Sequence, residues 1–315
     1  MGATQMPATK SSWSPYAQLI WLEKLVCIVI IHFTYVVGSL YAACLSQPKI
    51  ALQDVARINF LLLCGTFLLR SWACAWDDIV DRDLDKLVER CKRRPMASGK
   101  LSVRNAFLFT GFLCFVWIAL MKSLVSSFLT HGVALIVFSG VYPFTKRFTA
   151  YILVWLGLTF AWGVLVGFAA MGLDFVQLLL SSEESDPTIK GALLLFIYYT
   201  IWAVIFETVY AFQDLPDDTK AGINSMAVLE ASSLYYSGPP FFNIVMLFRM
   251  VTGIDFRSAE QCRWWFSHDP LMAGAVLIGS LCIEYLGRMG MVNYNCGFQY
   301  LLIQVQIRVF LGFNS

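Results

Sequence analysis

WDDIVDRDLD, residues 76–85, carries five aspartates within nine residues and comes directly after a long apolar run. Placing one ionised carboxylate in the middle of a lipid bilayer costs about 2.5–3.5 kcal/mol on insertion scales. Several carboxylates side by side also repel one another. A chain that places such a cluster at the end of an apolar segment therefore needs positive charge beside it, beyond what side chains alone supply.

The spacing of these aspartates predicts how they face. Asp78, Asp81 and Asp85 stand at i, i+3 and i+7, which predicts one shared helix face flanked by Asp77. Asp83 points the other way, towards solvent or an ion pair. A calcium loop is a weak alternative, because the Gly and Glu that such a loop needs are absent here. An ordinary solvated loop and an acidic relay in a transporter remain open as alternatives.

Composition sets the class of protein. The 315 residues are 58% hydrophobic and only 14% charged, whereas a soluble domain is nearer half apolar and a quarter charged. We therefore predict an all-α, polytopic membrane helical bundle, folded as a single integral-membrane domain over residues 1–315 with a flexible tail at 1–20. Apolar runs long enough to span a bilayer lie at 25–45, 56–76, 104–122, 126–144, 151–173, 191–211, 234–252 and 270–287, and a weaker ninth lies at 297–312.

The charges between these runs indicate the orientation. The loops after the second, fourth and sixth runs carry the Lys and Arg residues and fall on one side, which the positive-inside rule predicts to be cytosolic. The loop after the fifth run, SSEESDP at 181–187, is acidic and falls on the other side. The first residues contain neither a secretory apolar region nor an Arg-rich presequence. An endomembrane similar to the endoplasmic reticulum is therefore expected rather than the mitochondrial inner membrane.

A second acidic stretch, QDLPDD, follows the sixth run on the predicted cytosolic side. It holds Asp214 and Asp218, with Tyr210 one turn before Asp214. Two carboxylate clusters from separate segments suit hard divalent cations, and Mg²⁺ completes its shell with water and substrate phosphate. A diphosphate would account for both the acids and the nearby cations. The candidate cations for its oxygens are Arg90, Arg94, Lys146 and Lys220.

Four motifs together resemble the UbiA superfamily of intramembrane prenyltransferases. The family's N-D-x-x-D-x-x-x-D is similar to DDIVDRDLD at 77–85, with Asp77 in the Asn place, and its R-x-x-x-R-P-x-x-S-G to RCKRRPMASG at 90–99. YPFTKR at 142–147 matches Y-P-x-x-K-R. YAFQDLPDDTKAGINS at 210–225 matches the family's second aspartate motif. The motifs stand in family order across roughly residues 60–226.

The resemblance implies eight to nine transmembrane helices around a central cavity that both aspartate motifs cap. It also implies Mg²⁺-dependent transfer of an isoprenoid from its diphosphate to an aromatic acceptor. The implied metal ligands are Asp77, Asp78, Asp81, Asp85, Asp214 and Asp218, and Tyr210 is expected to hydrogen-bond nearby. No nucleic-acid partner is expected.

The helix-one signature of family members that act on 4-hydroxybenzoate is largely absent from WLEKLVC at 21–27. This favours transfer of farnesyl or a similar group to a polyketide-derived aromatic acceptor, as in fungal meroterpenoid biosynthesis. The 4-hydroxybenzoate step of quinone synthesis is the alternative within the enzyme class. A cation- or proton-coupled transporter is the alternative outside it. Residues 226–257 leave room for one span where the family usually has two, so the number of helices in the last third stays open.

Overall fold

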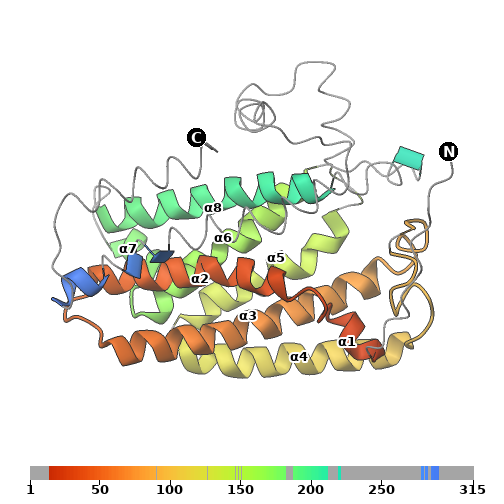
Figure 1. The fold of residues 1–315 in the computed structure, drawn as a ribbon, viewed down its shortest axis with the longest axis horizontal. Coiled ribbons are helices and arrows are strands. Elements are labelled where there is room, and N and C mark those ends of the chain that lie inside the picture. Colours follow the sequence, from red (N-terminus) through yellow and green to blue (C-terminus); the bar gives the residue numbers. More distant parts are fainter. Residues whose placement is uncertain are drawn as a thin grey trace, which may run out of the picture.

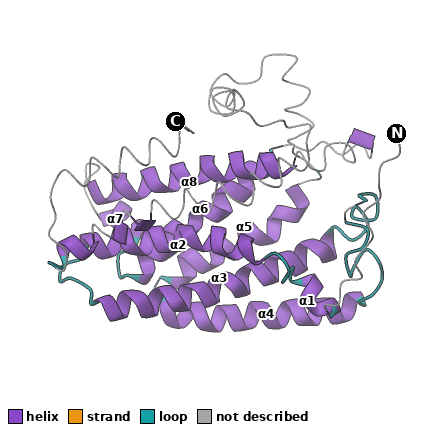
Figure 2. Cartoon of the chain, viewed as in Figure 1, coloured by secondary structure: helices purple, strands orange, loops and turns teal. Residues whose placement is uncertain are grey.

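The structure is a computed structural model that describes residues 14–89, 91–125, 127–145, 147, 149, 151–181, 187–211, 219–220, 278–279, 281–282 and 285–290. All regular elements over these residues are helices (Figures 1 and 2). They are α1 (Pro15–Leu19), α2 (Leu25–Leu45), α3 (Leu52–Val80), α4 (Val103–Leu124), α5 (Phe128–Thr145), α6 (Ile152–Ala170), α7 (Phe175–Ser181) and α8 (Pro187–Ala211).

Six of these helices, α2 to α6 and α8, are long and apolar enough to cross a membrane. The all-α prediction is thereby confirmed, and the chain is a multi-pass membrane protein. The predicted spans at 234–252 and 297–312 lie outside the described residues, and only parts of the span at 270–287 lie within them. The total of eight to nine helices therefore stays a prediction.

The predicted boundaries hold best where charge and polarity change abruptly. Helix α2 covers the predicted 25–45, whereas α3 exceeds the predicted 56–76 at both ends and runs over 52–80. The short helices α1 and α7 were not predicted. Helix α1 lies within the stretch expected to form a flexible tail, and its Leu19 is fully buried, so this part of the stretch packs against the bundle.

Helix α6 is the central element of the bundle. It packs against α2, α5 and α8, and more than half of its residues are buried. Gly167 permits the close approach to α2, because a Cβ atom there would collide with the backbone of Tyr35. Small residues at a helix crossing let membrane helices pack closely in this way.

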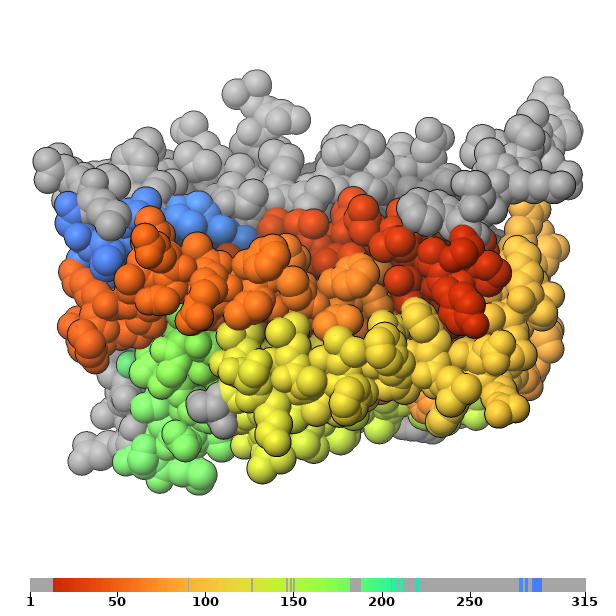
Figure 3. All heavy atoms as spheres, turned by 90° about the horizontal axis from the view of Figure 1, so that it is seen from below, coloured from red at the N-terminus to blue at the C-terminus, as the bar shows by residue number. Residues whose placement is uncertain are grey.

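On the outside of the bundle, α4 lies along α3 and covers much of one face (Figure 3). Phe107, Leu108, Phe112 and Phe115 of α4 are more than half exposed. A row of exposed apolar side chains on a spanning helix is the surface that lipid covers.

Helix α5 contains Pro143, which removes one backbone donor from the helix interior. Two indoles from neighbouring helices donate to carbonyls on the preceding turn. Trp155 Nε1 lies 2.7 Å from Phe138 O, and Trp76 Nε1 lies 2.9 Å from Gly140 O. Arg147, just beyond the helix, donates to Val80 O at 3.2 Å. These bonds fix the end of α5 against α6 and against the end of α3.

Successive spanning helices run in alternating directions, so the same end of the bundle collects the start of α2 and the ends of α3, α5 and α8 (Figure 1). We call this the site end. The first aspartate motif begins in the last turn of α3 there, and Tyr210 lies in the last turn of α8. The topology thus brings two segments more than a hundred residues apart to one end of the molecule.

Candidate active site

The aspartates of the first motif separate into a buried group and one exposed member. Asp77, Asp78, Asp81 and Asp85 are all less than 9% exposed, and Asp78 is fully buried. Asp83 is exposed and pairs with Arg82 and Lys86. Hydrogen bonds from Lys86 and then Arg82 lower the pKa of Asp83 to about 2. Asp83 is thus exposed and ion-paired, as its spacing predicted, whereas the other four aspartates are buried.

The prediction that Asp78, Asp81 and Asp85 lie on one helix is only partly right. Helix α3 ends at Val80 with Asp81 as its C-cap, so Asp85 does not lie on the helix. The turn that follows keeps a helix-like hydrogen bond from Asp85 N to Asp81 O, at 2.8 Å. This turn carries Asp85 back towards Asp78.

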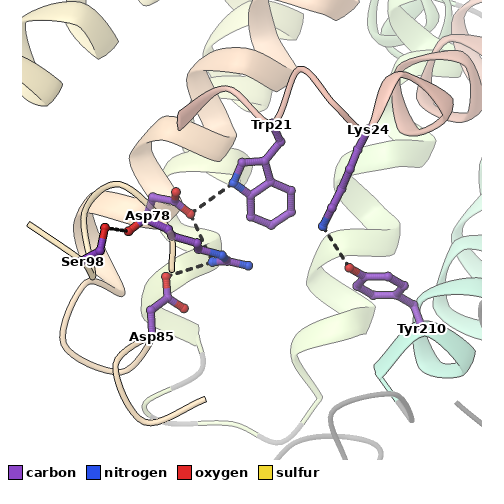
Figure 4. A network of polar contacts seen from close by, with 7 residues as sticks. Trp21, Lys24, Asp78, Asp85, Ser98 and Tyr210 are labelled. Atoms are coloured by element: carbon purple, nitrogen blue, oxygen red, sulfur yellow. Dashed lines mark hydrogen bonds and ion pairs between the residues drawn. The ribbon is translucent and has the colours of Figure 1, made fainter. Parts of the chain in front are cut away.

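Arg94 joins Asp78 and Asp85. Its Nη1 lies 3.1 Å from Asp78 Oδ1 and 2.9 Å from Asp85 Oδ2. Ser98 Oγ donates to the backbone carbonyl of Arg94 at 2.7 Å, which helps to fix the loop that carries Arg94 (Figure 4). Burial alone would lower the pKa of the Arg94 guanidinium, but the carboxylates of Asp78 and Asp85 outweigh it and raise the pKa above its usual value. Arg94 is therefore a permanent cation inside the acidic cluster.

Two side chains from the segment before α2 complete the site end. Trp21 Nε1 donates to Asp78 Oδ1 at 3.3 Å, and Lys24 Nζ donates to the Tyr210 hydroxyl at 3.2 Å. Figure 4 shows Trp21 between Asp78 and the Lys24–Tyr210 pair. Arg94 Cζ and Lys24 Nζ lie 4.4 and 4.3 Å from the centroid of the Trp21 ring, which places two cations on one indole.

The remaining predicted site residues are distributed as follows. Tyr210 lies at the site end and is half-buried, whereas Lys220 is exposed. Arg90, Lys146, Asp214 and Asp218 lie outside the described residues. The approach of the second aspartate motif to the first therefore stays a prediction. Tyr210 supports this prediction, because it stands four residues before Asp214 and hydrogen-bonds to Lys24 at the site end.

The described acids offer part of a metal site. Over the described part of the chain, no three His, Cys, Asp or Glu side chains converge closely enough to hold an ion on their own. Asp78 Oδ2, however, is buried without a hydrogen-bond partner among those residues, while Asp78 Oδ1 accepts from Arg94 and Trp21. A buried carboxylate oxygen without a partner is costly. It fits Mg²⁺, which needs only one or two carboxylates besides phosphate and water.

Comparison with known proteins decides the family. The pattern of the UbiA prenyltransferase family matches residues 31–268. The chain belongs to this family. It is 36% identical to the prenyltransferase ascA of Acremonium egyptiacum over 71% of this chain and 63% of that protein. It is 29% identical to the prenyltransferase stbC of Stachybotrys bisbyi over 90% of each chain.

Other members of the UbiA prenyltransferase family are also similar. The mitochondrial 4-hydroxybenzoate polyprenyltransferase of Schizosaccharomyces pombe is 29% identical over 76% of this chain and 71% of that protein. Among solved structures, a UbiA homologue from Archaeoglobus fulgidus bound to GPP and Mg²⁺ has a TM-score of 0.52 at 18% identity, over 95% of this chain and 97% of that one. At this identity the likeness establishes the fold.

Sequence reasoning missed Trp21 as a site residue and gave Lys24 no role. The signal that finds them is indirect: an aromatic residue and a lysine three apart stand just before the first spanning helix. Their partners, Asp78 and Tyr210, lie 57 and 186 residues away. Contacts over such separations leave no local pattern.

Proposed function

We propose that this UbiA-family protein transfers a farnesyl or similar isoprenoid group from its diphosphate to an aromatic, polyketide-derived acceptor. The observation that carries the proposal is the buried group of Asp78, Asp85 and Arg94 at the same end of the bundle as Tyr210. Buried carboxylates beside a permanent cation suit a substrate that arrives as a metal-bound polyanion.

The acidic and the basic residues of the site would have different roles. Asp77, Asp78, Asp81 and Asp85, with Asp214 and Asp218 of the second motif, would hold Mg²⁺. When bound, Mg²⁺ neutralises the diphosphate as it leaves. Arg94, with Arg90, Lys146 and Lys220, would bind the diphosphate oxygens and stabilise the negative charge that develops on them.

The apolar bundle supplies what the second half of the reaction needs. Ionisation of the allylic diphosphate leaves a carbocation that water would quench, so the reaction requires a dry apolar space, which would lie between the spanning helices. Aromatic faces stabilise a cation held over them. Trp162, Phe138 and Phe196 form a connected group, with ring centroids 5.2 and 5.9 Å apart, on α5, α6 and α8.

The choice between secondary metabolism and quinone synthesis depends on the sequence before α2, because relatives of both kinds match the chain. Fungal prenyltransferases such as ascA and stbC and mitochondrial 4-hydroxybenzoate polyprenyltransferases are both similar to the chain. The loss of the benzoate-type signature at 21–27 favours the first group. We place the protein in an endomembrane similar to the endoplasmic reticulum. A fluorescent fusion that co-localises with mitochondria instead would contradict this.

The test uses membranes that contain the full chain, farnesyl diphosphate and Mg²⁺ or EDTA. Diphosphate release should require Mg²⁺ and should fall by about a hundredfold or more in Asp78→Asn, because metal stabilisation of the transition state is worth several kcal/mol. Asp83→Asn is the matched control, since Asp83 is exposed and belongs to the same motif; its rate should match the wild type. Equal rates for both variants would reject the site. Mass spectrometry with orsellinic-type acids, 4-hydroxybenzoate and diphosphates of increasing length identifies the acceptor and donor.

A further inference from the structure

The chain makes an unusual turn just before α2, at residues 20–24. Trp21 has φ 51°, in the left-handed region that residues with a Cβ atom rarely adopt. Such a conformation persists only where surrounding contacts hold it. The turn is functionally placed, because it carries Trp21 to Asp78 and Lys24 to Tyr210.

Arg70 holds this turn. It lies in α3, eight residues before Asp78, and is only 7% exposed. Its Nη1 donates to the carbonyl oxygens of Ile20 and Trp21, at 3.2 Å each. No salt bridge of Arg70 to a carboxylate is found in the part of the chain that the structure describes. Besides the two carbonyls, Arg70 also contacts the side chain of Cys27 at the start of α2. A buried guanidinium that donates to two consecutive carbonyls fixes the backbone at Trp21, and this backbone sets the direction of the Trp21 side chain.

The fixed indole controls how Asp78 presents its carboxylate. Trp21 Nε1 and Arg94 Nη1 both donate to Oδ1, at 3.3 and 3.1 Å. The other oxygen, Oδ2, is buried without a partner among the described residues. The ring also lies between Asp78 and Lys24 (Figure 4), so it keeps the ammonium group away from the aspartates.

We propose that Arg70 is a positioning residue: by fixing the turn at 20–24 it holds Trp21 against Asp78, which leaves Asp78 Oδ2 open to a divalent cation and keeps Lys24 from taking its place. This inference rests on the proposed function, because it concerns the affinity of the aspartate group for that cation. Residues that orient a metal ligand typically change metal affinity by 10- to 100-fold when they are replaced.

The test measures Mn²⁺ binding to the purified full chain by electron paramagnetic resonance, without substrate. Trp21→Phe keeps a ring but loses the donor, and Arg70→Met keeps an unbranched apolar stem but loses both carbonyl bonds. Each should weaken Mn²⁺ binding by about tenfold. Arg70→Lys, which retains a cationic donor, should restore part of the affinity. Trp155→Phe is the matched control, because it also removes a half-buried indole donor, but one whose acceptor is the Phe138 carbonyl and not an aspartate; its Mn²⁺ affinity should equal that of the wild type.

A second readout separates positioning from general damage. In protein labelled with 5-fluorotryptophan, the ¹⁹F resonance missing from Trp21→Phe identifies Trp21. Arg70→Met should shift or broaden this resonance and leave that of Trp155 unchanged. In turnover, both variants should raise the Mg²⁺ concentration needed for half-maximal rate more than they lower kcat. If Arg70→Met does not fold, Arg70→Lys and Trp21→Phe carry the test.

The outcomes are distinguishable. A wild-type chain that neither binds Mn²⁺ nor releases diphosphate refutes the proposed function itself. A wild-type chain that does both, with Mn²⁺ affinity unchanged in folded Arg70 and Trp21 variants, refutes only the positioning role. Weaker Mn²⁺ binding in Arg70→Met with an unmoved Trp21 resonance also overturns the inference, because Arg70 would then act by another route.

Discussion

Arg94→Gln is the substitution that most directly tests the electrostatics of the site. Arg94 is 16% exposed in its side chain and contacts Asp78 and Asp85, whose side chains are 0% and 9% exposed. Glutamine retains a hydrogen-bond donor but removes the charge. Both carboxylates then lose a cation that they contact in a buried setting.

The size of the effect follows from that burial. Removing one partner of a buried ion pair typically lowers stability by about 3–5 kcal/mol, because the remaining charge stays uncompensated. A divalent cation that binds the same carboxylates replaces the missing charge. At a Mg²⁺ concentration of about 100 times its dissociation constant, binding adds roughly 2.7 kcal/mol to the stability of the folded state. Most of the loss in Arg94→Gln should therefore be recovered.

The assay is thermal unfolding in detergent, with Mg²⁺ varied against EDTA. Arg94→Gln should unfold at a clearly lower temperature than the wild type in EDTA, and Mg²⁺ should raise its Tm more than that of the wild type. Lys92→Gln is the control, since Lys92 lies in the same loop but is exposed and pairs with Glu89; its curve should follow the wild type at every Mg²⁺ concentration. Equal Tm values for Arg94→Gln and wild type in EDTA, or equal Mg²⁺ shifts, would show that Arg94 is not the counter-ion of the aspartates.

Three further outcomes are expected. Tyr210→Phe removes the hydroxyl that accepts from Lys24. It should slow diphosphate release by about tenfold, which corresponds to the free energy of one hydrogen bond to a charged group. Tyr151→Phe is the control, because Tyr151 is exposed and its rate should not change; equal rates for Tyr210→Phe and the wild type in a membrane assay would show that Tyr210 is not part of the site. Gly38→Ala forces a Cβ atom into the α6 backbone and should lower the free energy of unfolding by about 1–3 kcal/mol. Gly111→Ala, also within a helix, meets open space and should leave stability unchanged or raise it by up to about 1 kcal/mol. Equal Tm values for the two variants would contradict the close α2–α6 packing. Burial raises the pKa of Asp174, but hydrogen bonds that include the backbone donors at the start of α7 outweigh it and lower the pKa below its usual value. The ionised carboxylate should therefore stabilise the fold fully above about pH 4, and this stabilisation should be lost as the pH falls through the lower folded-state pKa. Asp174→Asn should not show this loss when Tm is measured from pH 7 to pH 3.

The sequence predicted those parts of the fold that depend on local hydrophobicity. Helix α2 matches its predicted range because polar residues bound its apolar run at both ends. Helix α3 was predicted too short because a search for apolar runs discards the polar residues at its ends, which are Gln53 and Asp54 at the start and Asp77 and Asp78 in the last turn. The membrane interface accepts such polar turns on a helix that continues beyond the hydrocarbon core.

The site was predictable to the extent that it is local. Asp78, Asp85 and Arg94 stand within seventeen residues, so spacing and charge alone assigned them to one site. The sequence assigned Arg94 to a diphosphate, and its contact with the two aspartates was not predicted. Trp21 and Arg70 were not predicted as site residues, because their contacts depend on how the segment between α1 and α2 packs against α3. An arginine inside an apolar run has no recognisable pattern until its carbonyl partners are known.

The position of the aspartates in α3 argues for function over stability. A helix C-terminus carries partial negative charge, so acids there are disfavoured by the helix dipole as well as by one another. Asp77 and Asp78 nevertheless lie in the last turn of α3, with Asp81 as its C-cap, and all three are buried. The ion pairs described for Asp78 and Asp85 both use the single guanidinium of Arg94. A bundle optimised for stability alone would place apolar residues at these positions. Acids kept there, with one oxygen of Asp78 left without a described partner, are the arrangement expected of a site that acquires its remaining positive charge with its substrate.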